Sequence, residues 1–339
     1  MILLCTLILL ALCGPAYGAC GKTCGLRPMP PTFSSSRVVG GTNVMPGYGA
    51  WAGLASVRTY FQPPLSMHNC GGTLINPKWV LTAAHCFDNV TNPIREWAVV
   101  LGGTSLGQIG PEVEVHRIKR LIIHEKYNFE LILHDVALLE LERPAKCSFT
   151  IQLACLPTPS TKLPELTNCY VAGWGDRIVK TAGNDILQQA KVPYVDRKTC
   201  NSTDWLDGLV NDFQVCAGQG GLSTCQGDSG GPLVCQDKSR GLYWQVGVTS
   251  WGIGCARYKR PTVFSSTQYY YNWIRYKTGV SFNVPVVTPA PAPAPAFTSA
   301  PLQTVAPGPT QPCPFPREKL LQFFNLLKDI LRYLKGKIF

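Results

Sequence analysis

Short strand-like runs dominate the sequence from Val38 to about Ser266, and they constrain the fold more than any other feature. Runs rich in Val, Ile, Leu, Trp and Tyr are separated by Gly, Pro and Asn, with little helical periodicity between them. The clearest runs are Trp79 to Thr82, Trp97 to Leu101, Val136 to Leu141, Val171 to Trp174 and Tyr243 to Ser250. This pattern predicts an all-β protein built of antiparallel barrels or a sandwich. One helical segment, Tyr269 to Lys277, closes the region.

The beginning of the chain has the features of an export signal. Met1 to Leu12 is almost wholly apolar and is followed by Ala16-Tyr17-Gly18, a small-x-small pattern suited to signal peptidase. We interpret residues 1–18 as a signal peptide; the alternative is a buried N-terminal strand. The sequence therefore predicts an exported protein.

The composition changes abruptly near the other end, at Val284. Residues 281–316 are rich in Pro and Ala, which predicts an extended linker without a core of its own. Residues 317–339 predict an amphipathic helix that is a candidate for removal during processing. We favour a protein contact for it over a lipid surface. Its apolar positions are Leu320, Phe323, Phe324, Leu327, Leu331 and Leu334.

The chain contains 15 cysteines and carries a formal net charge of +11. Loss of Cys5 and Cys13 with the signal would leave enough thiols for six disulfides and one spare, without the paired spacing of a zinc site. Nucleic acid is excluded as a partner outside the cell. The basic clusters at 116–120 and 257–260 are a solvated face or a surface for sulfated glycans. Sequons at Asn89 and Asn201 are candidate glycosylation sites.

Three separated motifs carry residue types suited to nucleophilic catalysis. Taken singly, His85 could be a structural histidine, Asp135 a strand-end cap and the glycine-rich run around Ser229 an ordinary turn. Their combination in this order favours a hydrolase. The motifs are Leu81-Thr82-Ala83-Ala84-His85-Cys86, His134-Asp135-Val136-Ala137-Leu138-Leu139 and Gly227-Asp228-Ser229-Gly230-Gly231-Pro232.

In these motifs the chain resembles the chymotrypsin and trypsin family of serine proteases, over about Arg37 to Lys277. The resemblance implies two packed antiparallel six-stranded β-barrels with a C-terminal helix, a protease domain over residues 38–280, and an active site between the barrels. It implies a serine endopeptidase that acts on protein substrates without a cofactor or a metal ion.

The chemistry explains why these residue types occur together. A serine hydroxyl is a weak nucleophile at neutral pH, so Ser229 needs His85 to accept its proton, and Asp135 would orient the imidazole. The resemblance assigns the oxyanion hole to the backbone N–H groups of Gly227 and Ser229. The remaining histidines match no catalytic motif, and we interpret them as surface or structural residues. They are His68, His116, His124 and His134.

The sequence Arg37-Val38-Val39-Gly40-Gly41 is typical of an activation cleavage site in this family. Cleavage after Arg37 would free the ammonium of Val38 to pair with Asp228 and order the oxyanion hole. Residues 19–37 would then form a light chain, disulfide-linked to the heavy chain. The resemblance pairs Cys70 with Cys86, Cys169 with Cys235, Cys200 with Cys216 and Cys225 with Cys255, leaving Cys147 and Cys155 for Cys20 and Cys24.

The floor of the primary specificity pocket departs from the tryptic pattern. Ser223 lies six residues before Ser229, where tryptic members have aspartate. Gly252 and Thr262 are the other pocket positions, and neither supplies a carboxylate. A substrate Arg or Lys would bury its charge without a partner, at a cost of several kcal/mol. We therefore expect a preference for apolar residues before the scissile bond, and a separate tryptic protease that cuts after Arg37.

Shorter motifs and the tail resemble one branch of the family, the proteases of the sperm acrosome. The motifs begin at Cys20, Ile122 and Cys200. This resemblance implies storage in the acrosome as a zymogen, release from the cell, and egg-coat glycoproteins, such as those of the zona pellucida, as substrates. Protease inhibitors and an activating protease are expected partners. The alternative is an adhesive protein that binds sulfated egg-coat glycans, with proteolysis secondary.

Overall fold

The computed structural model describes residues 20, 24–25, 36–38, 41–44, 53–62, 65–88, 93–175, 186–220 and 223–282. All of them lie in one unit, Met1–Val287. The predicted signal peptide, the proline-rich linker from residue 283 onward, the terminal helix and the sequon at Asn89 lie outside the described residues. Within the described part of the chain, no helix has the length and apolar character needed to span a membrane.

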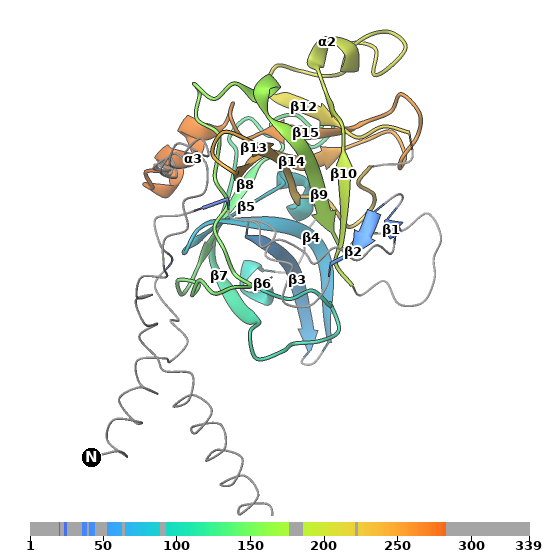
Figure 1. The fold of residues 1–339 in the computed structure, drawn as a ribbon. Helices are drawn as coiled ribbons and strands as arrows, with labels where there is room; N and C mark the ends of the chain where they lie inside the picture. Colours follow the sequence, from blue (N-terminus) through green and yellow to red (C-terminus); the bar gives the residue numbers. More distant parts are fainter. Residues whose placement is uncertain are drawn as a thin grey trace, which may run out of the picture. The chain divides into compact units, whose positions relative to one another are not determined.

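The first half of the described chain forms a closed six-stranded barrel with the strand order β3-β4-β5-β8-β7-β6 (Figure 1). All of its neighbouring strands are antiparallel. Strands β5, β6 and β8 are buried along their whole length, which explains why their sequences are mostly apolar; the exception in β8 is Glu140, which pairs with Lys119 and Arg120. The strands are β3 (Leu54–Gln62), β4 (Leu65–Asn76), β5 (Trp79–Thr82), β6 (Trp97–Leu101), β7 (Glu114–Ile123) and β8 (Ala137–Leu141).

The second half forms an antiparallel sheet of nine strands in the order β1-β2-β10-β9-β13-β14-β15-β12-β11. It contains more than the six expected strands. The hairpin of β1 and β2, which spans the predicted activation cleavage site, joins the sheet because β2 pairs with β10, and the short β11 pairs with β12. The strands are β1 (Ser36–Val38), β2 (Gly41–Asn43), β9 (Thr167–Gly173), β10 (Gln188–Val192), β11 (Tyr194–Val195), β12 (Gln214–Ala217), β13 (Pro232–Asp237), β14 (Leu242–Trp251) and β15 (Thr262–Ser266).

Helices are few and short. The predicted C-terminal helix is confirmed as α3 (Tyr271–Thr278), which ends at Gly279 in the left-handed conformation (φ 65°). Asp196 caps α2 (Arg197–Cys200) by accepting from the Thr199 N–H. The remaining turns are the 3₁₀ helices η1 (Ala84–Phe87), η2 (Ile94–Glu96) and η3 (Leu163–Glu165).

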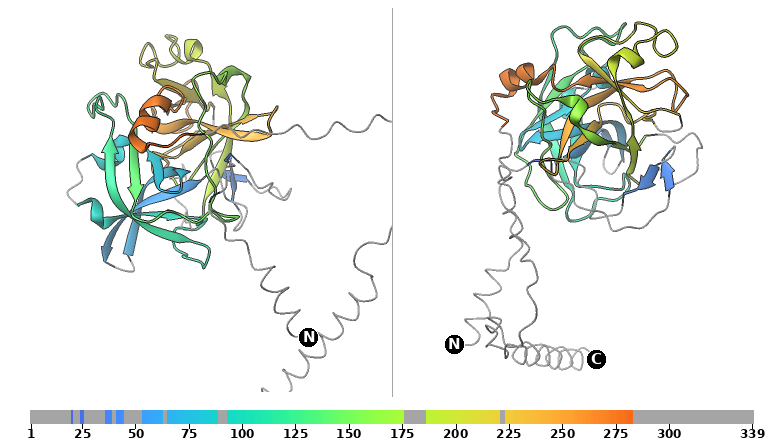
Figure 2. Two further views of the ribbon diagram at one scale, coloured as in Figure 1. Left: turned by 90° about the vertical axis from the view of Figure 1, so that its left-hand side faces the viewer. Right: turned by 45° about the horizontal axis from the view of Figure 1, so that its top comes forward.

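The two sheets lie against one another, as the views in Figure 2 show, and they share a hydrophobic core. One buried cluster contains Leu81 and Leu138 from the barrel together with Val234 and Val248 from the second sheet and Trp174, which directly follows β9. Packing at this density leaves little freedom for the elements on either side of the seam. Side chains projecting from those elements toward the seam are therefore held in fixed positions.

Six disulfides join cysteines of the described residues. Four are the pairs that the family resemblance implies, and the other two resolve the pairing that it left open between Cys20 and Cys24 on one side and Cys147 and Cys155 on the other. Two of them, Cys20–Cys147 and Cys24–Cys155, attach the segment before the activation site to the body. Gly25 strengthens this attachment, since its N–H donates to the Leu153 carbonyl and its carbonyl accepts from the Tyr243 N–H. Gly25 has φ 69°, and a Cβ there would collide with the Tyr243 carbonyl.

Candidate active site

His85 and Asp135 meet at the seam as the sequence predicts. His85 lies in η1, directly after β5, and Asp135 lies just before β8. The backbone N–H of His85 donates to Asp135 Oδ1 (2.9 Å), and its Nδ1 lies 2.7 Å from Oδ2. A third donor, the Ser250 hydroxyl, is 2.5 Å from Oδ2. The Asp135 carboxylate is 1% exposed and is stabilised by these charge-assisted bonds.

The electrostatics of this pair suit a general base. Burial by itself lowers the pKa of His85, but the hydrogen bond and the negative charge of Asp135 outweigh it and raise the pKa above its usual 6.5. Because a carboxylate accepts, the Nδ1 atom of the neutral imidazole carries the hydrogen. The Nε2 atom is then left to accept a proton.

Ser229 lies in the turn between β12 and β13, which contacts β4, a strand that precedes the His85 segment. Its carbonyl accepts from the Gly71 N–H at 2.7 Å, and the N–H of the next residue, Gly230, donates to the Thr249 carbonyl at 2.8 Å. Gly71 follows Cys70, which is disulfide-bonded to Cys86 beside His85. No hydrogen bond joins Ser229 Oγ to His85 among the described residues; such bonds are often long in unliganded enzymes.

Gly227 adopts φ 90°, a conformation that favours glycine. Its carbonyl lies 2.9 Å from His68 Nε2, while Ser56 Oγ lies 2.8 Å from His68 Nδ1. Because a carbonyl only accepts, Nε2 carries the hydrogen, and Ser56 donates to Nδ1. The Arg58 guanidinium in turn donates to Ser56 Oγ (2.9 Å). His68 is therefore a structural residue, one of the two alternatives that the sequence left open, and it supports the turn of the predicted oxyanion hole.

The pKa of His68 is lowered to about 4, mainly because the ring is buried. The positive charge of Arg58 acts in the same direction, and the bond to the Gly227 carbonyl opposes it. At neutral pH His68 is therefore uncharged, as its two hydrogen bonds require.

Asp228, the predicted partner of a new N-terminus, accepts from the backbone N–H groups of Gly175 and Cys225, both at 2.9 Å. A Cβ on Gly173 or Gly175 would collide with its carboxylate. Arg37 and Val38 lie in β1. The ion pair between Val38 and Asp228 belongs to the cleaved form, and it stays a prediction.

Three buried hydroxyls meet at the predicted pocket floor. Thr262 Oγ1 lies 2.6 Å from Ser223 Oγ and 2.8 Å from Thr224 Oγ1. Gly252 lies beside them, since a Cβ there would be 3.8 Å from Thr262 Cα. Within the described residues, no carboxylate is hydrogen-bonded to any of the three hydroxyls.

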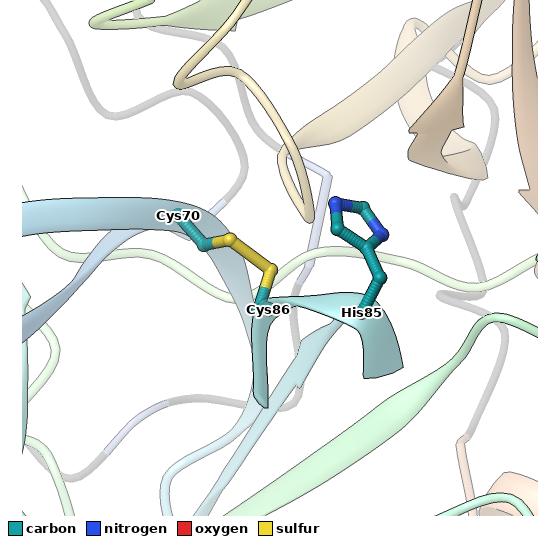
Figure 3. A group of neighbouring side chains, drawn as sticks. All are labelled: Cys70, His85 and Cys86. Carbon is teal, nitrogen blue, oxygen red and sulfur yellow. A yellow bond between two sulfur atoms is a disulfide. The ribbon is translucent and has the colours of Figure 1, made fainter. Parts of the chain in front are cut away.

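Cys70, His85 and Cys86 also come close enough together to suggest a metal site (Figure 3). The two sulfur atoms are joined in a disulfide, however. Metal coordination by cysteine requires the thiolate. With both sulfurs in the disulfide, this cluster does not have the thiolates that a metal site would need.

Sequence reasoning missed Ser250, His68 and Thr224 as parts of the site. Each makes its contact across a long stretch of chain; Ser250 bonds a residue 115 positions away, and His68 one 159 positions away. Position gave a weak signal for two of them, since Ser250 precedes the pocket residue Gly252 and Thr224 follows Ser223.

The second sequon is described. Asn201 follows α2, and its Oδ1 accepts from the Val210 N–H at 2.9 Å. Attachment of a glycan to its Nδ2 stays a prediction.

Comparison with protein families gives a match that spans the whole site. The trypsin family model matches residues 38–274, from β1 to the interior of α3, and so includes His85, Asp135 and Ser229. The match covers more than half of the chain and agrees with the barrel architecture. The chain therefore belongs to the trypsin family of serine proteases.

Proposed function

We propose that this protein is a secreted serine endopeptidase, made as a zymogen, in which Ser229 is the nucleophile, His85 the general base and Asp135 its orienting group. The single observation that carries this proposal is the buried Asp135 carboxylate, which accepts from the backbone and the imidazole of His85 and from Ser250. These three donors hold the Asp135 carboxylate in place, and the carboxylate in turn fixes the orientation of the His85 imidazole. The Nε2 atom is then free to act as the base.

In the proposed reaction, Ser229 Oγ attacks the carbonyl carbon of the scissile bond while its proton moves to His85 Nε2. Negative charge forms on the carbonyl oxygen, where the N–H groups of Gly227 and Ser229 would receive it; loss of one such donor typically costs about 2.7–4 kcal/mol. The imidazolium then donates its proton to the leaving amine. Water repeats the sequence to release the acyl group from Ser229.

The pocket supports a preference for uncharged side chains before the scissile bond. Ser223 and Thr262 are 5% and 4% exposed, and their hydroxyls bond to each other. A substrate ammonium or guanidinium would meet these neutral groups in place of a carboxylate, and it would break their bond. About 1.4 kcal/mol corresponds to a tenfold change in rate. Burying the substrate charge without a partner costs several kcal/mol, so it should lower the rate of cleavage after Arg or Lys by several orders of magnitude.

Activated protein tests this specificity. The full chain is cleaved after Arg37 by a tryptic protease, which is then removed, and matched peptides with Arg, Leu or Ala before the scissile bond are compared. We expect kcat/KM to be highest for Leu or Ala. A large preference for Arg would contradict the pocket assignment without affecting the triad.

The two disulfides to residues 20 and 24 support a light chain that stays attached after cleavage. This arrangement, with the tail, is similar to that of acrosin, the sperm acrosomal protease. We therefore propose storage in the acrosome and egg-coat glycoproteins as substrates. An Arg37→Gln variant is expected to remain inactive, and full peptidase activity of the uncut variant would contradict the zymogen proposal.

Binding to sulfated glycans is a second candidate function. Arg117, Lys119 and Arg120 are exposed along β7, and Glu140 is the shared carboxylate partner of the last two. The Ser229→Ala variant would isolate adhesion from proteolysis. Binding that weakens steeply with added salt supports this function, and binding that is absent or insensitive to salt contradicts it.

A further inference from the structure

His134, the residue before Asp135, occupies the middle of a stack of three rings. Its imidazole lies 4.1 Å from the Phe213 ring, at 22° to it, and 5.2 Å from the His124 ring, at 8° (centroid distances). His134 Nδ1 lies 3.0 Å from the Tyr270 hydroxyl. The contacts come from the hairpin that carries Asp135, the segment before β12 and the start of α3. His134 thus connects the first barrel to elements of the second half of the chain.

The backbone at this point is also constrained. His134 has φ 50°, a left-handed conformation that is uncommon for residues other than glycine. Its carbonyl accepts from the Val136 N–H (2.9 Å), and the Val136 carbonyl accepts from the His124 N–H (3.1 Å). Asp135 lies inside this turn. A side chain locked in a stack can keep such a turn in place, and its release would let Asp135 shift.

We propose that His134 is a positioning residue for Asp135, held by Phe213, His124 and Tyr270, and that acid releases this hold by protonating the His124–His134 pair. The inference rests on the proposed catalytic role of Asp135. Nothing in the chemistry requires His134 to touch substrate.

The ring stack can accommodate one proton on the His124–His134 pair, but a second proton disrupts it. One imidazolium can lie on the face of Phe213 with a favourable cation–π contact, and the Tyr270 hydroxyl can accept from it. A second proton places like charges on two parallel rings 5.2 Å apart. Burial is the main reason that the pKa of each histidine is lowered. The neighbouring His134 lowers the pKa of His124 further, and Lys126 lowers the pKa of His134 further.

The surrounding charges do not offset this repulsion. Lys126 follows His124 in its own turn, and Lys277 faces His124 from α3; both add positive charge. Glu125 acts in the opposite direction and raises the pKa of His124. It is already bonded to Lys277 and to the Trp273 indole of α3, however, and the pKa of His124 remains lowered. On the remaining sides, Asp212 beside Phe213 is paired with Arg197, and Tyr270 has a raised pKa because it is buried. Asp135 is bonded to His85 and Ser250.

The pH dependence of the activated full-length enzyme tests the proposal. Active sites are counted with a phosphonate, and kcat and KM for a leucine or alanine peptide are measured from pH 5 to 8. For the native chain we expect kcat to fall on the acid limb of the pH profile more steeply than a single protonation allows. At pH 5 it should be about tenfold below the curve for one protonation. A one-proton limb in the native chain would overturn the proposal.

Two variants separate the ring from the backbone. His124→Phe keeps an aromatic ring in the stack and removes one titrating group, so we expect a one-proton limb and kcat at pH 8 within about twofold of native. His134→Asn accepts the left-handed backbone but removes the ring, so kcat at pH 8 should fall about tenfold with little change in KM. Native behaviour of both variants would overturn the proposal.

His116→Gln is the matched control, because His116 is a buried histidine on β7 that bonds Glu114 away from the stack. It should keep the steep acid limb. Thermal unfolding of every variant at pH 8 and pH 5 identifies any that is merely unstable; loss of the steep limb in His116→Gln as well would overturn the proposal. Failure of the native enzyme to label at Ser229 would instead contradict the proposed function.

Discussion

The carboxylate at the catalytic seam and the floor of the primary pocket are both buried polar sites, and they are built in opposite ways. Asp135 is a charge that accepts from three donors. The pocket floor holds three neutral hydroxyls that bond to one another. Both arrangements are stable because buried polar groups need partners, and a buried charge needs several.

This difference separates chemistry from specificity. The seam retains the charge that the reaction requires, because its donors are supplied by the fold itself. Within the described residues, the predicted pocket floor presents hydroxyls and no carboxylate, because the position that would carry the charge is Ser223. On the proposed function, the chain keeps the reaction of its family and differs in the residue at which it cuts.

Replacing the charge at the seam tests the first half of this comparison. Asp135→Asn keeps the shape but presents an amide to His85, which favours the wrong imidazole tautomer. We expect kcat to fall about 10⁴-fold with little change in KM. Steady-state kinetics on active-site-titrated enzyme measures this. A loss of less than about tenfold would mean that the carboxylate is structural only.

Adding a charge to the pocket tests the second half. Ser223→Asp combined with Thr262→Gly supplies a carboxylate and room to reach it, so kcat/KM for arginine peptides should rise about 10²- to 10³-fold. Thr262→Gly alone is the control, and it should enlarge the pocket without this gain. An equal gain in the control would show that size, and not charge, excludes arginine.

A third test concerns the hydrogen-bond network of His68, which supports the Gly227 turn beside the seam. In the unfolded chain His68 has its usual pKa of about 6.5, whereas in the folded chain the pKa is about 4. Acid therefore protonates the unfolded chain first, and stability that is complete above pH 6.5 is lost as the pH falls toward 4. The loss should approach about 3 kcal/mol of unfolding free energy at pH 4.

Denaturant unfolding of the native chain and of His68→Gln from pH 7.5 to 4.5 measures this contribution by difference. The raised pKa of His85 has the opposite sign: its stabilisation is complete below pH 6.5 and lost at higher pH, and it cancels in the comparison. Parallel curves for the two proteins would refute the neutral His68 network.

The smallest effect is expected where the activation segment is attached. The double variant Cys20→Ser with Cys147→Ser leaves Cys24–Cys155 in place. Because the lost bridge then closes only a short additional loop, its removal should lower the free energy of unfolding by about 2 kcal/mol. Electrophoresis without reductant, after cleavage at Arg37, should still show one linked species. Removal of both bridges should release the segment; release after loss of the first bridge alone would contradict the pairing.

Much of the architecture could be predicted from the sequence, because the strands appear in it as mostly apolar runs of about four to ten residues. Trp79–Thr82 and Trp97–Leu101 have the predicted bounds. The nine-stranded second sheet could not be predicted, since β1 and β2 join it through backbone pairing rather than through an apolar pattern. The motifs around the triad indicated which side chains to examine.

The supports of the site were harder to find. His134 was set aside although it precedes Asp135, because its stack with Phe213 and its bond to Tyr270 depend on packing between distant segments. Thr224 and Ser250 carry ordinary hydroxyls that have no pattern of their own. Local sequence predicts which groups react, whereas only the folded chain shows what holds them.

Labelling of Ser229 tests the central claim most directly. The protein is cleaved after Arg37, treated with an organophosphonate, and mapped by mass spectrometry beside Ser229→Ala and an uncut sample. We expect one phosphonylated residue, Ser229, in the cleaved native chain and none in the Ser229→Ala variant. An unlabelled Ser229 in correctly cleaved, folded protein would contradict the proposed triad.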